Sequence, residues 1–366
     1  MSIFYSFPKK YHKSFKVTRR RPADIRFSES YNFPVLNYAD YCGDTVIRAY
    51  RDLIIDEGIT VTTDNPCKGL YIYCDGDCII NGTLSMTARG AKFDPSGVDV
   101  GCRPKGEAFC SIEVTYPYNI EQLEDYIRKY INSISEFGIP TMAWPSYLIN
   151  NIYSIPLGEE DLAAIPAVGA DGAPKITQAN KNVTGQAGSN GTNRQSGGGG
   201  GGGGYQNSSR GGKGTAYSGG AGGGGGGYSY DPTPNDIGGA GTDGWHPTSS
   251  TQGGGGAGNP NGAGGIKVAD GTGGLIILVV RGNLTIGANG IIESKGIDGN
   301  SGKGTTDYGS GGGGSGGGSI NIFYQGTYTK TGQVLATGGA GGLKNSSTNS
   351  RDGGKGGDGC ITEQQI

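Results

Sequence analysis

The chain has 366 residues, with 76 glycines, 30 basic and 32 acidic residues and 34% hydrophobic residues. No apolar stretch is long enough to span a membrane, and the first thirty residues lack the apolar region of a secretory signal. We therefore expect no membrane insertion, small conventional cores, and synthesis and assembly in a cytoplasm.

Residues 1–60 are expected to form an N-terminal attachment arm. Basic residues alternate there with tyrosine and phenylalanine, and the candidate attachment residues are Lys13, Arg19, Arg20 and Arg21. A basic, aromatic arm can bind nucleic acid, an anionic membrane or an acidic protein, or it can be a solvated tail. We expect a protein partner and no nucleic acid. Within the arm, residues 38–58 suit a short amphipathic helix, with a strand as the alternative.

Residues 61–100 predict a β-rich shoulder, because short runs with period-two alternation are bounded there by glycine, proline or aspartate. Residues 76–90 share a plan of strand, turn, strand and glycine with residues 282–296 and, more loosely, with 324–338. Such copies are typical of a β-solenoid or of stacked hairpins, in which each rung covers the next.

A small α/β insertion is expected over residues 101–168. Its best element is an amphipathic helix at 119–138, where Ile120, Leu123, Ile127 and Ile131 recur at spacings of three and four. Asn119 can cap this helix and Gly138 can end it. The insertion separates the first copy of the repeat from the other two.

Residues 169–366 form a glycine-rich distal domain. Only 11 of the glycines precede Gly169, so roughly one residue in three is glycine beyond it. Ordering glycine is entropically costly, and backbone hydrogen bonding between close extended chains could offset that cost. Runs of glycine interrupt any collagen triplet, which favours a polyglycine-II-like lattice or a β-solenoid with glycine-rich turns. The apolar run 274–280 predicts a fully buried strand that anchors the glycine layers.

Catalytic and metal sites are poorly supported by the sequence. Only His12 and His246 are present, so no Ser-His-Asp or Cys-His arrangement and no zinc spacing is indicated. We expect no enzyme and no cofactor. The chain has seven cysteines, and Cys74 and Cys78 are separated by only three residues; packing thiols, a disulfide and a metal site are the alternatives for that pair.

Binding loops are the better-supported reading of the glycine-rich half. The short non-glycine segments between the glycine runs contain aromatic residues beside serine and asparagine, a composition typical of recognition surfaces. The alternative is that these aromatic residues cap the edges of a glycine lattice. The candidate receptor-binding residues are Tyr205, Tyr217, Tyr228, Tyr230, Trp245, His246 and Tyr308.

Two features of the sequence resemble phage proteins, the glycine runs and a stretch near residues 65–92. The glycine runs 197–204, 222–227 and 311–318 resemble polyglycine-II layers in tip adhesins of some T-even-like bacteriophages, whose loops bind the host surface. Residues 65–73 and 82–92 resemble a segment common in glycine-rich tail proteins of phages and phage-like particles of Firmicutes. The N-terminal half departs from the T-even adhesins.

The resemblance implies a virion structural protein, a tail fibre or receptor-binding adhesin. Its partners would be other virion proteins of the baseplate, fibre or capsid, and a glycan or protein of the host cell surface. A homo-oligomer, such as a trimer, is expected, located in the virion after assembly in the host cytoplasm and release by lysis. The alternatives are a non-adhesive head fibre or baseplate decoration, and a bacterial extracellular filament or surface protein.

Overall fold

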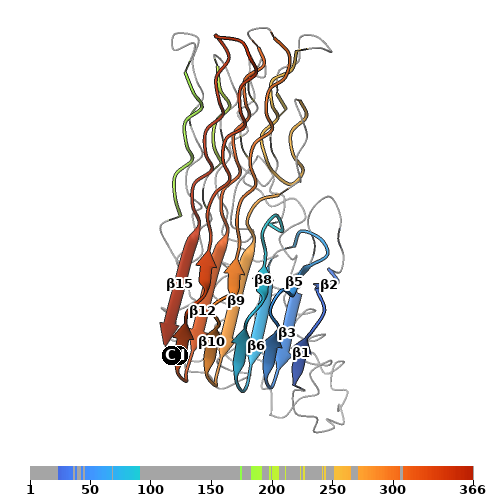
Figure 1. The fold of residues 1–366 in the computed structure, drawn as a ribbon, viewed down its shortest axis with the longest axis vertical. Helices are drawn as coiled ribbons and strands as arrows, with labels where there is room; N and C mark the ends of the chain where they lie inside the picture. The colour runs from blue at the N-terminus through green and yellow to red at the C-terminus, as the bar shows by residue number, and fades with distance from the viewer. Residues whose placement is uncertain are drawn as a thin grey trace, which may run out of the picture.

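The computed structural model describes residues 24–35, 38, 43, 46–67, 69–90, 174, 183–191, 198, 200–205, 211, 223, 226, 241, 243–244, 251–264, 271–305 and 308–365. Within these ranges the chain forms strands and extended segments but no helix (Figure 1). The strands are β1 (Ile25–Phe27), β2 (Tyr31–Phe33), β3 (Val46–Tyr50), β4 (Leu53–Ile55), β5 (Thr60–Thr63), β6 (Leu70–Cys74), β7 (Cys78–Ile80), β8 (Thr83–Ser85), β9 (Leu275–Val280), β10 (Leu284–Ile286), β11 (Ile291–Glu293), β12 (Ser319–Tyr324), β13 (Tyr328–Lys330), β14 (Gln333–Leu335) and β15 (Cys360–Gln365).

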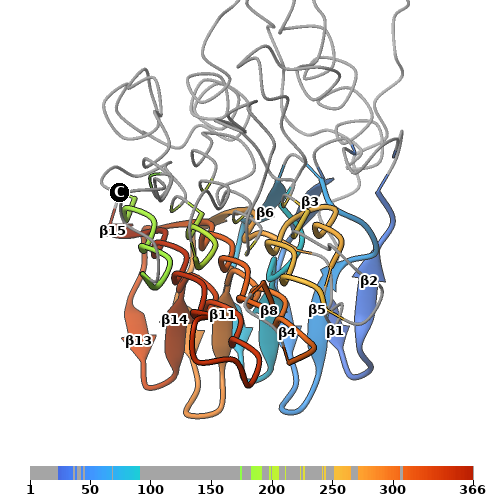
Figure 2. The ribbon, with the colours of Figure 1, turned by 90° about the horizontal axis from the view of Figure 1, so that it is seen from above.

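The strands make three five-stranded sheets, ordered β1-β4-β7-β10-β13, β2-β5-β8-β11-β14 and β3-β6-β9-β12-β15. All pairs between these strands are parallel. Each strand therefore pairs with strands three places before or after it in the chain. We call each set of three consecutive strands, one from each sheet, a rung. Figure 2 shows the rungs following one another from β1 and β2 at one side to β13 and β14 at the other.

The expected mainly-β chain is confirmed, and the repeat copies lie side by side. Strand β7 pairs with β10 and β10 with β13, while β8 pairs with β11 and β11 with β14. The two strands of one copy lie in different sheets, so the named strands form no hairpin. Residues 46–50 and 53–55 are strands of the same sheets, which decides the open choice at 38–58 in favour of strands. The proposed helix at 119–138 and the rest of 101–168 lie outside the described residues.

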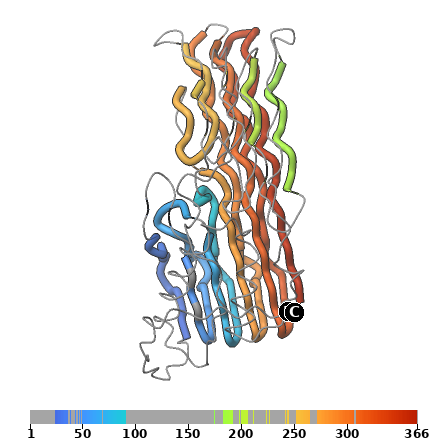
Figure 3. The backbone as a smooth tube through the Cα atoms, turned by 180° about the vertical axis from the view of Figure 1, so that it is seen from behind, coloured from blue at the N-terminus to red at the C-terminus, as the bar shows by residue number. Residues whose placement is uncertain are grey.

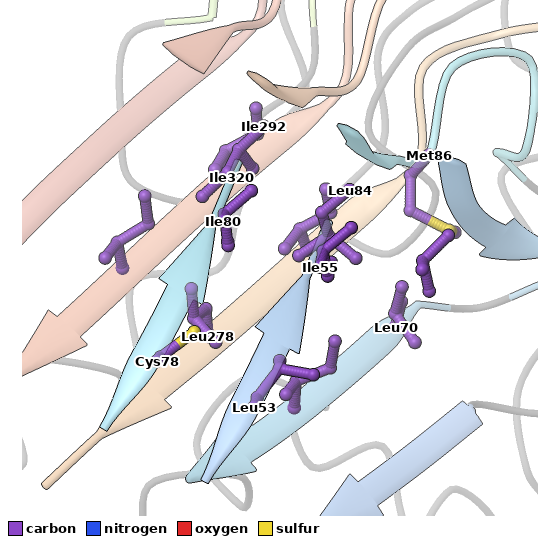
Figure 4. Packing of buried hydrophobic residues seen from close by; sticks show 14 of the residues in the cluster. Leu53, Ile55, Leu70, Cys78, Ile80, Leu84, Met86, Leu278, Ile292 and Ile320 are labelled. Atoms are coloured by element: carbon purple, nitrogen blue, oxygen red, sulfur yellow. The ribbon is translucent and has the colours of Figure 1, made fainter. Parts of the chain in front are cut away.

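The core is a column of mainly aliphatic side chains, in which residues that face the column alternate with residues on the other face of the strands. One buried cluster takes residues from all three sheets, because period-two strands turn every second side chain to the same side. Figure 4 shows Ile80, Ile292 and Ile320, one from each sheet, within this cluster. The predicted buried strand at 274–280 is confirmed as β9, whose six residues are all buried.

Polar side chains stack at the turns that lead, in successive rungs, from β3 to β4, from β6 to β7, from β9 to β10 and from β12 to β13. Asp52 Oδ1 accepts the backbone N–H of Asp77 at 2.8 Å, and Asp77 Oδ1 accepts the backbone N–H of Asn283 at 2.7 Å. Asn283 Oδ1 in turn accepts the backbone N–H of Thr327 at 2.9 Å. Each rung thus satisfies one backbone donor of the next rung and helps to fix its register.

Replacing Asp77 tests this ladder. Asp77→Ala should lower the free energy of unfolding by about 1 kcal/mol, because the N–H of Asn283 loses its acceptor. Asp77→Asn should stay close to the parent, since Asn283 already fills the equivalent position one rung later. Thermal unfolding of both variants measures the difference. Equal loss in the two variants would show that the side-chain oxygen of Asp77 is not what matters.

The glycine-rich chain continues the strands as extended segments. Segments 294–303 and 336–345 follow β11 and β14, and segments 309–318 and 351–359 lead into β12 and β15. Figures 1 and 3 show them running together beyond the sheets. We call these four, together with 183–191, 198–204 and 251–257, the glycine segments.

Hydrogen bonds between glycine segments recur at every third residue. The backbone N–H groups of Gly311, Gly314 and Gly317 donate to segment 351–359 at 2.9 to 3.0 Å. Those of Gly312, Ser315 and Gly318 donate to segment 294–303 at 2.8 to 3.0 Å. A repeat of three residues is that of the polyproline II helix, which has no hydrogen bonds of its own. Each segment therefore depends on its neighbours.

Close approach explains why these positions are glycine. A Cβ atom on Gly311, Gly312 or Gly313 would lie 1.8, 2.2 or 1.9 Å from the carbonyl oxygen of Gly342, Gly255 or Gly201, respectively. Three successive residues of one segment thus meet three different neighbours. No side chain fits between backbones at that spacing, whereas outward positions such as Ala340 are exposed and accept one.

A single added methyl group should therefore be harmful only at inward positions. Gly342→Ala places a Cβ 2.0 Å from the Asn300 oxygen, and we expect a loss of roughly 1–3 kcal/mol, as for overpacked cores. Ala340→Ser, two residues earlier on the exposed side, is the matched control and should be nearly neutral. Denaturant unfolding compares the two variants, and equal stability would contradict the close packing.

Candidate functional site

The candidate site is the end of the glycine segments farthest from the strands, which we call the distal end. Residues 304–308 join segment 294–303, which leaves β11, to segment 309–318, which enters β12. Residues 346–350 join the segments of β14 and β15 in the same way. Because the segments run away from the strands and return, both connections lie at the distal end, as Figure 1 shows.

Two of the sequence-predicted residues, Tyr205 and Tyr308, meet at the distal end. Their ring centroids lie 6.1 Å apart with an interplanar angle of 83°, an edge-to-face contact. Tyr205 is 8% exposed and Tyr308 is 37% exposed. The structure thus brings together an inner and an outer ring from segments a hundred residues apart.

The backbone holds Tyr205 in place. The N–H of Gly204 donates to Gly311 at 3.0 Å, and the N–H of Tyr205 donates to Val183 at 3.2 Å. Tyr205 has φ of 76°, in the left-handed region that bulky residues rarely adopt. Such a conformation persists only where its surroundings determine it. The inner ring is therefore a fixed support for Tyr308.

The second connection, residues 346–350, is built from serine, threonine and asparagine. Asn345 Oδ1 accepts the N–H of Ser347 at 3.0 Å, and Ser347 Oγ accepts the N–H of Asn349 at 3.3 Å. Arg351 Nη1 donates to the carbonyl of Thr348 at 2.6 Å. These local bonds shape the loop and leave Ser346, Thr348 and Asn349 exposed.

Exposed apolar side chains also lie at the distal end. Leu343 is 66% exposed, and its backbone is bonded to Ser301 and Gly302 on the neighbouring segment. Val183, whose carbonyl accepts from Tyr205, is 40% exposed. With Tyr308 they supply apolar surface beside hydroxyl and amide groups, which suits recognition of a partly apolar, partly polar ligand. The sequence analysis did not single out Leu343 and Val183, because neither lies in a segment with aromatic residues between glycine runs.

The other predicted receptor-binding residues are Tyr217, Tyr228, Tyr230, Trp245 and His246, and they lie outside the described residues. The segment just before Trp245 is described: Gly241 and Gly244 donate to Pro260 and Ala263 at 2.9 and 2.7 Å. The candidate attachment residues Lys13, Arg19, Arg20 and Arg21 also lie outside the described residues.

Three of the cysteines are part of the core. Cys67, Cys74 and Cys78 are buried free thiols, which agrees with packing thiols and not with a disulfide for the Cys74–Cys78 pair. Burial raises the pKa of Cys67 from 9.0 to about 11, and it raises the pKa of Cys74 well above its usual value, with a further contribution from Cys78. Cys360 also forms no disulfide with a described residue, and it is only half-buried.

Thiol labelling should reflect this difference. At pH 8, iodoacetamide should modify Cys360 before Cys67, Cys74 or Cys78, because the side chains of these three are buried and inaccessible to the reagent. Peptide mass spectrometry over a time course measures each rate, with urea-unfolded protein as the control for intrinsic reactivity. Uniform labelling of all four in the folded protein would contradict the buried positions.

The described ranges hold no cluster of three or more histidine, cysteine, aspartate or glutamate side chains that could bind a metal ion. Within those ranges there is also no helix with the length and hydropathy needed to cross a bilayer. Comparisons with protein-family models, with curated proteins and with solved structures found no match to this chain.

Proposed function

We propose that this chain is a virion structural protein, a tail fibre or receptor-binding adhesin whose distal end contacts the host cell surface. The observation that supports it best is the Tyr205–Tyr308 pair, held by backbone hydrogen bonds at the far end of the glycine segments. A partly exposed ring on a fixed ring loses little conformational freedom on binding.

The finer architecture belongs to the same proposal. The rungs are taken as a β-solenoid, because consecutive strands visit three sheets in turn and the same order recurs. The glycine segments are taken as a polyglycine-II lattice, because their hydrogen bonds repeat every three residues and point to several neighbours. Residues 119–138 would add one amphipathic helix. A lattice of this kind is a stiff stalk between particle and host.

The proposed ligand is a glycan or protein of the host cell surface. Tyr308 offers an aromatic face, Leu343 offers an aliphatic patch, and Thr348 and Asn349 offer exposed hydroxyl and amide groups. In this proposal Tyr217, Tyr228, Tyr230, Trp245 and His246 belong to further loops of the same surface. No catalytic role or cofactor is assigned.

Attachment to the particle is proposed for the N-terminal part. Lys13, Arg19, Arg20 and Arg21 precede β1 in the sequence, and β1 belongs to the first rung, whereas segments 294–303 and 336–345 continue from later rungs. A partner in the baseplate, fibre or capsid would bind there, and copies of the chain would associate as a homo-oligomer such as a trimer.

A non-adhesive virion component is the second candidate. Tyr205 is buried against Tyr308 at the edge of the glycine segments, which is also what a structural cap would do. In that case the aromatic pair would protect the segment ends from fraying and would contact no host molecule. The two candidates differ in whether removal of the outer ring changes stability or binding.

Cell binding by the full chain separates them. Tyr308→Ala should weaken saturable binding to host cells about tenfold, as loss of a central aromatic contact does, with an unchanged melting temperature. Tyr31→Ala is the matched control, since Tyr31 is similarly exposed at 43% but stands in the first rung. Labelled protein is titrated onto candidate Firmicute hosts and their isolated cell walls.

Trp245→Ala and Tyr230→Ala extend the same titration to the other loops. Undiminished binding by all three distal variants, with normal folding, would reject the distal adhesive surface. A lower melting temperature for Tyr308→Ala without any loss of binding would favour the structural cap.

A further inference from the structure

The interior of the rungs is arranged in columns that run through all five rungs. In one column the residues paired in register are Arg48, Ile72, Leu278, Ile322 and Glu363. The three middle residues are aliphatic and buried. The first and last rungs thus place a charged residue where the middle rungs place leucine or isoleucine.

The last rung also replaces aliphatic residues at two further interior positions, once with a tyrosine and once with a lysine. Tyr328 pairs with Leu284, and Lys330 pairs with Ile286, both of which are buried in the rung before. Glu363 accepts a hydrogen bond from the Tyr328 hydroxyl at 2.9 Å and two from Lys330 Nζ at 2.7 Å. The charged side chains keep 38% and 24% exposure for Lys330 and Glu363. An ion pair therefore closes the end of the apolar column.

The first rung closes the other end with a different set of groups. Arg48 lies over the ring of Phe33, 5.1 Å from its centroid, a cation–π contact. Phe27 packs edge-on against Phe33 at 5.9 Å and against Tyr50 at 6.3 Å. Here an aromatic layer with one cation covers the column.

We propose that the last rung is an end cap, and that the charges of Lys330 and Glu363 prevent a second copy of the chain from adding its rungs there. Among the described strands, β13, β14 and β15 each pair on one side alone, and an unpaired strand edge invites pairing with another chain. Inward-pointing charges oppose such pairing, because a further rung would bury them.

Desolvation supports this for either way in which a second copy could stack on the last rung. Contact with the first rung of the second copy would bury one Lys330–Glu363 pair, and contact with its last rung would bury two. Removing the solvent from such an ion pair carries a desolvation penalty that can exceed the attraction between its charges. This inference is independent of the proposed host binding.

The test restores the aliphatic column in the full chain. Lys330→Ile with Glu363→Ile copies the residues of the preceding rung, Ile286 and Ile322. The matched control is Lys295→Ile with Glu293→Ile. These residues form an ion pair at the end of β11 in the fourth rung, with side-chain exposures of 37% and 15%. Light scattering coupled to gel filtration gives the mass of each protein over a wide concentration range.

We expect the end variant to associate with rising concentration, reaching about twice the mass of the parent, while the control keeps the parent mass. A folded end variant that keeps the parent mass would overturn the proposal, as would equal association of the control. If the double variant does not fold, Lys330→Met with Glu363→Gln removes both charges with little change in side-chain length and should associate more weakly. Parent mass for this variant, if it folds, would then overturn the proposal.

Discussion

Backbone hydrogen bonding between neighbouring extended chains is the constraint on which the whole molecule depends. In the sheets it connects strands of successive rungs in register, and in the glycine segments it connects neighbours at every third residue. Extended chains satisfy no donors within themselves, so an isolated rung or segment would leave its polar backbone groups without partners. The stability of the sheets, and that of the glycine segments, thus depends on several rungs or segments lying side by side.

The two halves differ in what lies between the backbones. In the sheets, aliphatic side chains such as Ile80 and Leu278 fill the interior and contribute burial. In the glycine segments, backbones approach until no Cβ fits, so close packing and hydrogen bonds replace apolar area. Segment 309–318 passes into β12 without a break, which joins the two kinds of packing within one continuous chain.

The sequence was informative where a pattern repeats and uninformative where contacts are long-range. The copies at 76–90, 282–296 and 324–338 were recognisable because each begins near a glycine and ends at one. The equivalent strands β4 and β5 were not recognised as a further copy of the repeat, because Arg51 stands where the three copies have Gly76, Gly282 and Gly326. The contact between Tyr205 and Tyr308 could not be predicted, since it depends on which segments become neighbours and not on local composition.

The glycine segments are held together by backbone hydrogen bonds. Their packing therefore does not depend on the amino-acid sequence of the loops that connect them. The connections at 304–308 and 346–350 can therefore diverge in sequence without disturbing the hydrogen bonds beneath them. Because the hydrogen bonds repeat every three residues, inserting three residues into each of two adjoining segments would lengthen the glycine segments by about 9 Å and keep the connections facing the same way. The length of the glycine segments can thus change independently of the sequence of the connections.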